Sequence, residues 1–353
     1  MSKRIVSVLG ARPQFVKAAV VSAALQDFGH EEVMVHTGQH YDYNMSEVFF
    51  QALNIPKPRY SLGIGGGLHG EMTGRQLMAI EQCLLTEKPD LVLVYGDTNS
   101  TLAGALAAVK LHIPVAHVEA GLRSFNMRMP EEVNRILTDR ISRWLFTPSV
   151  IASGHLRAEG IASECVIEVG DVMHDAVLRF SRGDVELPVA LPQRYGLVTI
   201  HRAENTDDEA HLEAIVDGLC RVAGSLPLIM PIHPRTRQRL ATLGWLERLT
   251  RAVQVLEPVG YLEMLALQKH ADVVITDSGG IQKEAFFLQV PCITLREETE
   301  WVETVDLGWN RLVPGLSGPS IEAAVLGAGR PETAQAQPYG DGRASARIAA
   351  ALG

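Results

Sequence analysis

The sequence predicts an α/β protein made of two doubly wound domains. Short runs rich in β-branched residues alternate with longer amphipathic segments, which is the pattern of βαβ units around a parallel sheet. The run LVLVY at residues 91–95 is apolar at nearly every position, as expected of a strand that helices cover on both faces. At 353 residues the chain is long for one hydrophobic core and sufficient for two.

The elements expected in the first half follow this alternation. Strands are predicted at residues 4–9, 32–36, 91–95, 115–118 and 144–146. Helices are predicted at residues 12–26, 70–85, 101–111 and 130–141. Together they form the first domain, residues 1–180.

A change of pattern marks the domain boundary. The segment 181–192 (SRGDVELPVALP) has no helical period and contains two prolines, so we expect a linker there. Strands are then predicted at residues 196–200, 228–230, 253–256, 273–276 and 292–295. We expect a second domain over 181–341 and, after the turn PYGDG, a final helix within 342–353 that packs back on the first domain.

Composition excludes several classes of protein. Hydrophobic residues make up 46% and charged residues 21%, and no apolar run approaches the roughly 20 residues that cross a bilayer. The four cysteines lack CxxC spacing, which favours reduced thiols in the cytoplasm over disulfides or zinc. A net charge of -9 argues against nucleic acid as a partner. No GxGxxG pattern follows a predicted strand and there is no Walker A pattern, so we expect no NAD or ATP. No pair of His, Cys or carboxylate residues has metal-ligand spacing, so we expect no metal cofactor.

Two strand-to-helix turns carry candidate phosphate-binding residues, because ligands of open α/β sheets bind at the carboxyl ends of the strands. In GARPQFVK, the new helix offers N–H groups, and Arg12 and Lys17 add positive charge toward a diphosphate. The alternative is a plain turn with two surface cations. Both interpretations stay open.

The second turn, in VVITDSGGIQKEAF, is the sharper candidate. Ser278, Gly279 and Gly280 follow a strand and open a helix, so backbone amides and a hydroxyl can approach a phosphate closely. Glu284, one turn further on, is suited to accept hydrogen bonds from ribose hydroxyls. The alternative is a corner with an exposed glutamate, but the compact Ser-Gly-Gly favours phosphate binding.

Carboxylates gather at the predicted strand ends of the first domain. Asp97 follows LVLVYG, Glu119 follows PVAHV, and Glu131 opens the helix at 130–141 together with Glu132. Each has a structural alternative, such as a helix cap or an i,i+4 pair between Glu131 and Arg135. If they meet at one crevice, they raise one another's pKa and provide proton donors and acceptors near neutral pH.

Histidines follow strands of the second domain. His201 lies in TIHRAEN beside Arg202, and His233 lies in MPIHPR. A lone histidine in a loop usually has no special role, but at a strand end His201 is a candidate for diphosphate binding or acid–base chemistry.

These motifs, taken in order along nearly the whole chain, resemble one enzyme family. The series GARPQFVK, GQH, VYGDTNST, HVEAGLRS, PEEVNR, HRAEN, IHPR, TDSGGIQKEA, ETEWVET and PYGDGRAS resembles the non-hydrolysing UDP-N-acetylglucosamine 2-epimerases. The resemblance implies a GT-B-type fold of two Rossmann-like domains with a deep interdomain cleft. It also implies a cytoplasmic homodimeric isomerase of polysaccharide biosynthesis.

The resemblance further implies a mechanism and a set of residues. A base removes the C2 proton while UDP departs, giving a 2-acetamidoglucal, and UDP re-adds after protonation on the opposite face. The implied catalytic residues are Asp97, Glu119, Glu131, His201 and Arg135. The implied UDP-binding residues are Arg12, Lys17, Arg202, His233, Ser278, Gly279, Gly280 and Glu284.

The sequence also departs from the commonest family pattern. Asp42 stands where members regulated by a second UDP-N-acetylglucosamine carry a glutamine. GGGLHGEMTG and TEWVET are more similar to the branch acting on UDP-2,3-diacetamido-2,3-dideoxyglucuronate, which is the alternative substrate. The remaining alternatives are a GT-B glycosyltransferase, a hydrolysing epimerase and a UDP-sugar-binding protein without catalysis.

Overall fold

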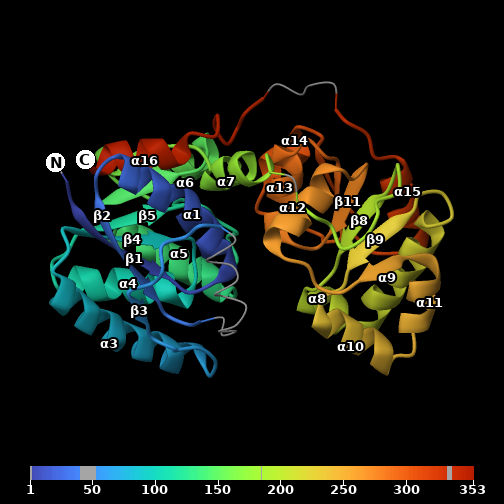
Figure 1. Cartoon of the computed structure of the whole chain (residues 1–353), viewed down its shortest axis with the longest axis horizontal. Coiled ribbons are helices and arrows are strands. Elements are labelled where there is room, and N and C mark those ends of the chain that lie inside the picture. The colour runs from blue at the N-terminus through green and yellow to red at the C-terminus, as the bar shows by residue number, and fades with distance from the viewer. Residues whose placement is uncertain (1, 40–52, 184, 332–335) are drawn as a thin grey trace. The chain divides into compact units, whose positions relative to one another are not determined.

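The computed structural model describes residues 2–39, 53–183, 185–331 and 336–353. The chain divides into two compact units, Met1–Arg179 with Gln337–Gly353, and Phe180–Ala336 (Figure 1). Each unit contains one parallel sheet with helices on its faces. Within the described ranges, every helix is too short or too polar to cross a membrane.

The sheet of the first unit has the strand order β3-β2-β1-β4-β5-β6-β7. Its strands are β1 (Arg4–Leu9), β2 (Glu31–His36), β3 (Tyr60–Ser61), β4 (Leu91–Tyr95), β5 (Val115–Val118), β6 (Trp144–Thr147) and β7 (Val166–Glu168). Its helices are α1 (Arg12–Asp27), α3 (His69–Glu87), α4 (Asn99–Lys110), α5 (Pro130–Ile141), α6 (Val150–Ala158), α7 (Val172–Phe180), α16 (Ala344–Leu352) and a 3₁₀ turn at Ser163–Cys165.

The second unit repeats this order as β10-β9-β8-β11-β12-β13. Its strands are β8 (Gly196–Thr199), β9 (Leu228–Pro231), β10 (Gln254–Leu256), β11 (Val273–Thr276), β12 (Cys292–Thr294) and β13 (Asn310–Leu312). Its helices are α8 (Ala203–Thr206), α9 (Glu209–Val222), α10 (Pro234–Thr242), α11 (Leu246–Ala252), α12 (Tyr261–Lys269), α13 (Gly279–Phe287), α14 (Val302–Asp306) and α15 (Gly318–Leu326).

Strand order locates the binding edge of each sheet. In the first unit the chain runs outward from β1 to β2 and β3, then returns to β4 on the other side of β1. Ligands of open α/β sheets bind at the carboxyl ends of the strands where the order reverses. That point lies between β1 and β4 in the first unit, and between β8 and β11 in the second.

The cores explain why the central strands are mostly apolar. Val8 and Val94, from β1 and β4, lie in one buried cluster with Ile80 of α3 and Ala103 of α4. On the other side of the sheet, α16 lies beside α1 (Figure 1). Burial on both faces leaves the strand ends as the place where polar side chains reach solvent.

The described strands confirm the predicted ones to within one residue at either end. Three strands were not predicted: β3, β7 and β13, which have two or three residues each. The final helix begins at Ala344, because the Asp175 carboxylate of α7 accepts the N–H groups of Ala344 at 3.0 Å and Ser345 at 2.8 Å.

Candidate active site

Asp97 and Arg135 form the best-defined ion pair at the binding edge of the first unit. Arg135 Nη2 of α5 donates to Asp97 Oδ2 over 2.5 Å, and Asn134 Nδ2 donates to the Asp97 carbonyl over 2.9 Å. The alternative role of Asp97 as a helix cap is wrong, because the side chain of Thr98 caps α4. The carboxylate of Asp97 is therefore held by α5 rather than used by α4.

Glu119 follows β5 in a conformation that L residues rarely adopt. Its φ is +71°, in the left-handed region, and its buried carboxylate accepts a hydrogen bond from Lys17 Nζ of α1. A Cβ on Gly96, the residue before Asp97, would lie 3.4 Å from Glu119 Oε2 and 3.9 Å from Lys17 Nζ. The turn that carries Asp97 thus lies directly against the Glu119–Lys17 pair.

Burial and three charged groups act on the Asp97 carboxyl group. Burial raises its pKa, the Arg135 guanidinium opposes that rise, the Glu119 carboxylate adds to it, and Lys17 lowers it. Burial disfavours the charged form of an acid, so Asp97 binds a proton more readily than a carboxyl in water. A carboxyl group with a raised pKa at a binding edge is a candidate for proton transfer.

Glu131 and Glu132 separate into different environments. Glu132 is 1% exposed and accepts from the N–H groups of Ser124 and Phe125, each over 2.9 Å, and from Arg135 Nη1 over 3.0 Å. The i,i+4 pair between Glu131 and Arg135 was wrong, because Arg135 turns toward Glu132 and Asp97. Glu131 is exposed in the first turn of α5.

The turn after β1 differs from the open anion site that the sequence predicts. The side-chain oxygen of Gln14 accepts from the N–H groups of Gly10 at 2.7 Å and Ala11 at 3.0 Å. These amides are therefore occupied, and Lys17 is paired with Glu119. Arg12 opens α1, but its side chain lies outside the described structure, as does Asp42.

In the second unit, a buried carboxylate organises the loop after β8. Asp277, fully buried at the end of β11, accepts from the backbone N–H groups of His201 and Arg202 at 3.0–3.1 Å and from Asn205 Nδ2 at 3.1 Å. The His233 ring centroid lies 5.7 Å from that of His201. Asp277 was not predicted as a site residue, although it follows a buried strand just as Asp97 does.

The Ser-Gly-Gly turn opens α13 without a side-chain cap. Ser278 is the N-cap residue, and its side chain makes no bond to the first turn of α13. The N–H groups of a first turn without a side-chain cap are suited to an anion. Glu284 is 6% exposed and accepts from Gln268 Nε2 over 2.6 Å, so the alternative of an exposed glutamate is wrong. Burial raises the pKa of Glu284 to about 7.

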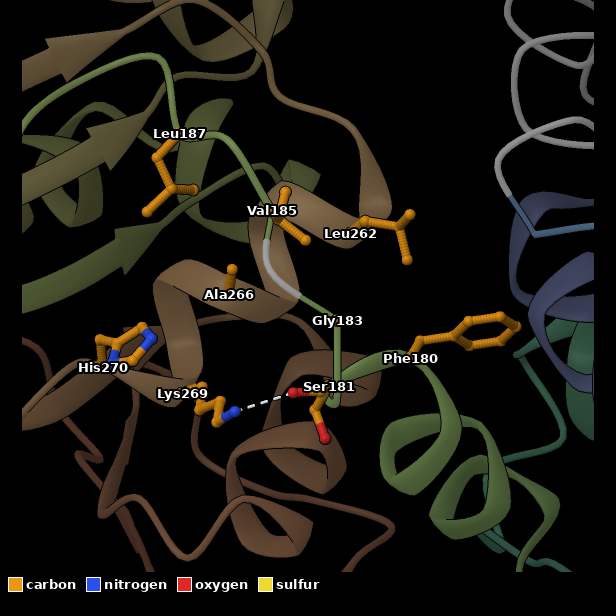
Figure 2. Close-up of a pocket in the computed structure, with 9 residues that line it drawn as sticks. All are labelled: Phe180, Ser181, Gly183, Val185, Leu187, Leu262, Ala266, Lys269 and His270. Atoms are coloured by element: carbon orange, nitrogen blue, oxygen red, sulfur yellow. Dashed lines mark hydrogen bonds between the residues drawn. The ribbon is translucent and has the colours of Figure 1, made fainter.

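A cavity of about 200 Å³ in the second unit is lined by none of these residues. Its wall comes from residues 180–183 and 185–187 and from α12, where Lys269 Nζ donates to the Ser181 carbonyl over 2.8 Å (Figure 2). It contains no strand end and none of the predicted site residues, so we do not take it as the active site. Among the described side chains, no group of three or more His, Cys, Asp or Glu is arranged to hold a metal ion.

Known proteins are similar to this chain in sequence and in fold over nearly their whole length. The family model of UDP-N-acetylglucosamine 2-epimerase matches residues 23–353. The UDP-2,3-diacetamido-2,3-dideoxy-D-glucuronate 2-epimerase of Pseudomonas aeruginosa is 53% identical over 98% of both chains. The UDP-N-acetylglucosamine 2-epimerase of Methanocaldococcus jannaschii is 44% identical, over 97% of this chain and 96% of its own.

Solved structures agree with the sequence relatives. The crystal structure of the Methanocaldococcus jannaschii enzyme with UDP-N-acetylglucosamine and UDP has a TM-score of 0.88, at 43% identity over 99% of both chains. This similarity confirms the predicted GT-B-type α/β fold with two Rossmann-like domains. The chain belongs to the UDP-N-acetylglucosamine 2-epimerase family.

Proposed function

We propose that this protein is a non-hydrolysing UDP-N-acetylglucosamine 2-epimerase, which interconverts UDP-N-acetylglucosamine and UDP-N-acetylmannosamine. The observation that carries the proposal is the carboxylate pair at the β4 and β5 ends, where burial and the Glu119 carboxylate raise the pKa of Asp97. Breaking the C–H bond at C2, the carbon that bears the acetamido group, requires a positioned base. A plain binding protein gives no reason to bury acids of this kind.

The reaction balances without an external reductant or oxidant. A base takes the C2 proton as the C1–O bond breaks, so UDP leaves with the bonding electrons and 2-acetamidoglucal forms. A proton then adds to the opposite face of C2, and a diphosphate oxygen of UDP attacks C1. We assign this proton chemistry to Asp97, Glu119, Glu131 and His201, with Arg135 holding Asp97 in position.

We assign UDP binding mainly to the second unit. The uncapped first turn at Ser278, Gly279 and Gly280 suits the departing diphosphate, since amide dipoles stabilise developing negative charge. Glu284 suits the ribose. Arg202 and His233 lie on the loops after β8 and β9 and add polar groups there, and Arg12 and Lys17 complete the proposed set from the first unit.

One alternative substrate has a specific observation in its favour. The Pseudomonas aeruginosa relative, 53% identical, is named for UDP-2,3-diacetamido-2,3-dideoxyglucuronate. The alternative keeps the same C2 chemistry and differs in the groups at C3 and C6 of the sugar. A glycosyltransferase, by contrast, gives no reason for Asp97 and Glu119 to be held together.

We further propose a cytoplasmic homodimer. The four cysteines are free thiols, as is usual for proteins of a reducing compartment. Exposed Met78 and Leu85 lie seven residues apart on α3, and so on one helix face, which suits contact with a second copy. Sedimentation of the purified protein tests the dimer.

The test of the reaction uses heavy water. The protein is incubated with UDP-N-acetylglucosamine, or with the diacetamido uronate, without added NAD or metal, and C2 is followed by NMR. Deuterium at C2 in both epimers supports the proposal, and the faster substrate identifies the sugar. Absence of exchange with every UDP-acetamido sugar would refute it, and stoichiometric free sugar would indicate a hydrolysing enzyme.

A further inference from the structure

His117 lies within β5 and is completely buried, with an oxygen atom at each ring nitrogen. Its Nδ1 is 2.7 Å from Oδ1 of Asp139, a residue of α5, and its Nε2 is 2.7 Å from the carbonyl oxygen of Gly96. His117 thus makes two hydrogen bonds and lies two residues before Glu119 in the sequence. The mechanism described above gives this histidine no part.

Both partners of His117 accept hydrogen bonds. The Gly96 carbonyl has no proton to donate, so Nε2 carries one. Oδ2 of Asp139 accepts from Arg123 Nη1 over 2.8 Å and from the Gly121 N–H over 3.2 Å, which favours the ionised carboxylate. Nδ1 therefore donates to Asp139 as well, and the ring is an imidazolium.

The imidazolium is bonded to the turn that carries the proposed catalytic carboxylate Asp97. The Gly96 carbonyl and the Asp97 N–H belong to one planar peptide, so holding the carbonyl also fixes the direction in which Asp97 leaves the strand. The Gly96 N–H donates to the Val118 carbonyl over 3.0 Å, which ties the same turn to the residue before Glu119.

We propose that His117 is a positioning residue for C2 proton transfer. It is a buried imidazolium, bonded to Asp139, that fixes the Gly96–Asp97 peptide. This inference rests on the proposed function. Among the described residues, the charged groups around His117 and its turn include Asp139, Arg123, Glu159, Asp97, Arg135, Glu119 and Lys17.

The contribution that we expect from His117 is the alignment of Asp97 for proton transfer. A displacement of about 1 Å at a reacting group can cost roughly 100-fold in rate, so a base on a turn requires that the backbone of the turn be fixed by a hydrogen bond. A neutral side chain in place of His117 gives up one of the two bonds, since a glutamine amide nitrogen and oxygen cannot both donate.

The charge is tested by nitrogen NMR on protein labelled at histidine. We expect both ring nitrogens of His117 to carry a proton in these spectra, because each faces an oxygen that accepts a hydrogen bond. His30 is the internal reference: its Nδ1 accepts from the Lys3 N–H over 3.2 Å, so one nitrogen lacks a proton. The His117 signals are assigned by their loss in His117→Gln, or by their change in Asp139→Asn.

The positioning role is tested by kinetics. We expect His117→Gln to lower kcat for C2 exchange about 100-fold, with KM changed less than about 3-fold and UDP affinity unchanged. The control is His30→Gln, another buried histidine that borders α16. If His117→Gln does not fold, Asp139→Asn is measured in its place, with the same fall in kcat expected.

A single protonated nitrogen on wild-type His117, or a fall in kcat no larger than that of His30→Gln, overturns the inference. Failure of the proposed function gives a different result, namely no exchange by the wild-type protein with any UDP-sugar. The two failures are therefore told apart by the wild-type protein alone.

Discussion

Arg135 donates from Nη2 to Asp97 Oδ2 over 2.5 Å, and from Nη1 of the same guanidinium to Glu132 over 3.0 Å. One cation thus connects a half-buried acid at a strand end with a buried acid that holds the loop at Ser124. The guanidinium fork suits this double contact better than an ammonium group. Arg135 both positions Asp97 and limits how far burial raises its pKa.

Replacing Arg135 by glutamine is expected to move the pH dependence of exchange. Burial raises the pKa of Asp97 and Arg135 lowers it, so loss of the guanidinium raises that pKa further. The limb of the pH–rate profile that Asp97 controls should move to higher pH, whether Asp97 acts as acid or base. The measurement is kcat for C2 exchange against pH.

Arg140→Gln is the matched control for that measurement. Arg140 lies on the same helix and donates from Nη2 to the Glu159 carbonyl, away from Asp97. Its profile should match the wild type. A limb that stays in place in Arg135→Gln would show that Asp97 does not control it.

The left-handed backbone at Glu119 predicts an unusual order of stability. Glu119→Gly and Glu119→Ala both remove the carboxylate and leave Lys17 without this partner. At φ +71°, however, alanine is strained and glycine is not, so the glycine variant should be more stable by about 1 kcal/mol. Urea unfolding measures the difference, and both variants should lose exchange. Greater stability of the alanine variant would contradict the backbone argument.

The close packing at Gly279 predicts a cost for any side chain there. A Cβ at this position would lie 2.6 Å from Glu300 Oε1 and 3.3 Å from Trp301 Nε1, so in Gly279→Ala the Glu300 side chain must move and the new methyl group occupies space at the first turn of α13. We expect UDP affinity to fall about 10-fold, or 1.4 kcal/mol, by calorimetry. Gly329→Ala, at an exposed glycine with no neighbour within 4 Å, serves as the control. Equal UDP affinity in the two variants would refute the assignment of this turn.

Burial of Glu284 predicts a loss of stability as pH rises. Its pKa is about 7 in the folded protein against an ordinary value of 4.5, so ionisation is harder when folded. Below about pH 4.5, Glu284 does not change the free energy of unfolding. Between about pH 4.5 and pH 7 its contribution lowers this free energy progressively, and above about pH 7 the total loss is about 3 kcal/mol. Glu284→Gln, which keeps an acceptor for Gln268, should therefore be more stable than the wild type at pH 8 and equal to it near pH 4.5.

Urea midpoints at several pH values test this prediction. Glu257→Gln is the control, since the Glu257 side chain is 82% exposed. A difference between wild type and Glu284→Gln that does not vary with pH would show that Glu284 is not a titrating group in this range.

Much of the fold could be predicted because each strand carries its own local signal. Runs such as residues 91–95 are apolar throughout, and a turn or helix start follows each one. That pattern also locates Asp97 and Glu119, since residues just past a buried strand lie at the binding edge. Very short strands such as β13 carry no such signal.

The partners of these residues could not be predicted, because they come from distant parts of the chain. Asp277 holds backbone amides 75 and 76 residues earlier, and Lys17 meets Glu119 over 102 residues. Glu131 and Glu132 are neighbours in sequence and alike in composition, and only the helix phase decides which one is buried. The local sequence pattern therefore predicts the position of a residue along a helix or strand. It does not predict which residues from other parts of the chain contact it.

The Gln14 side chain, which occupies the N–H groups after β1, has a consequence for inhibitor design. The two units repeat one strand order, but their turns differ. In the turn after β1, the Gln14 side chain occupies the N–H groups, whereas the turn after β11 has no side-chain cap. A pyrophosphate mimic is therefore expected to bind at the N-terminus of α13. Compounds aimed at the first unit should instead carry a compact cation or a flat, glycal-like ring that complements the Asp97 and Glu119 acids.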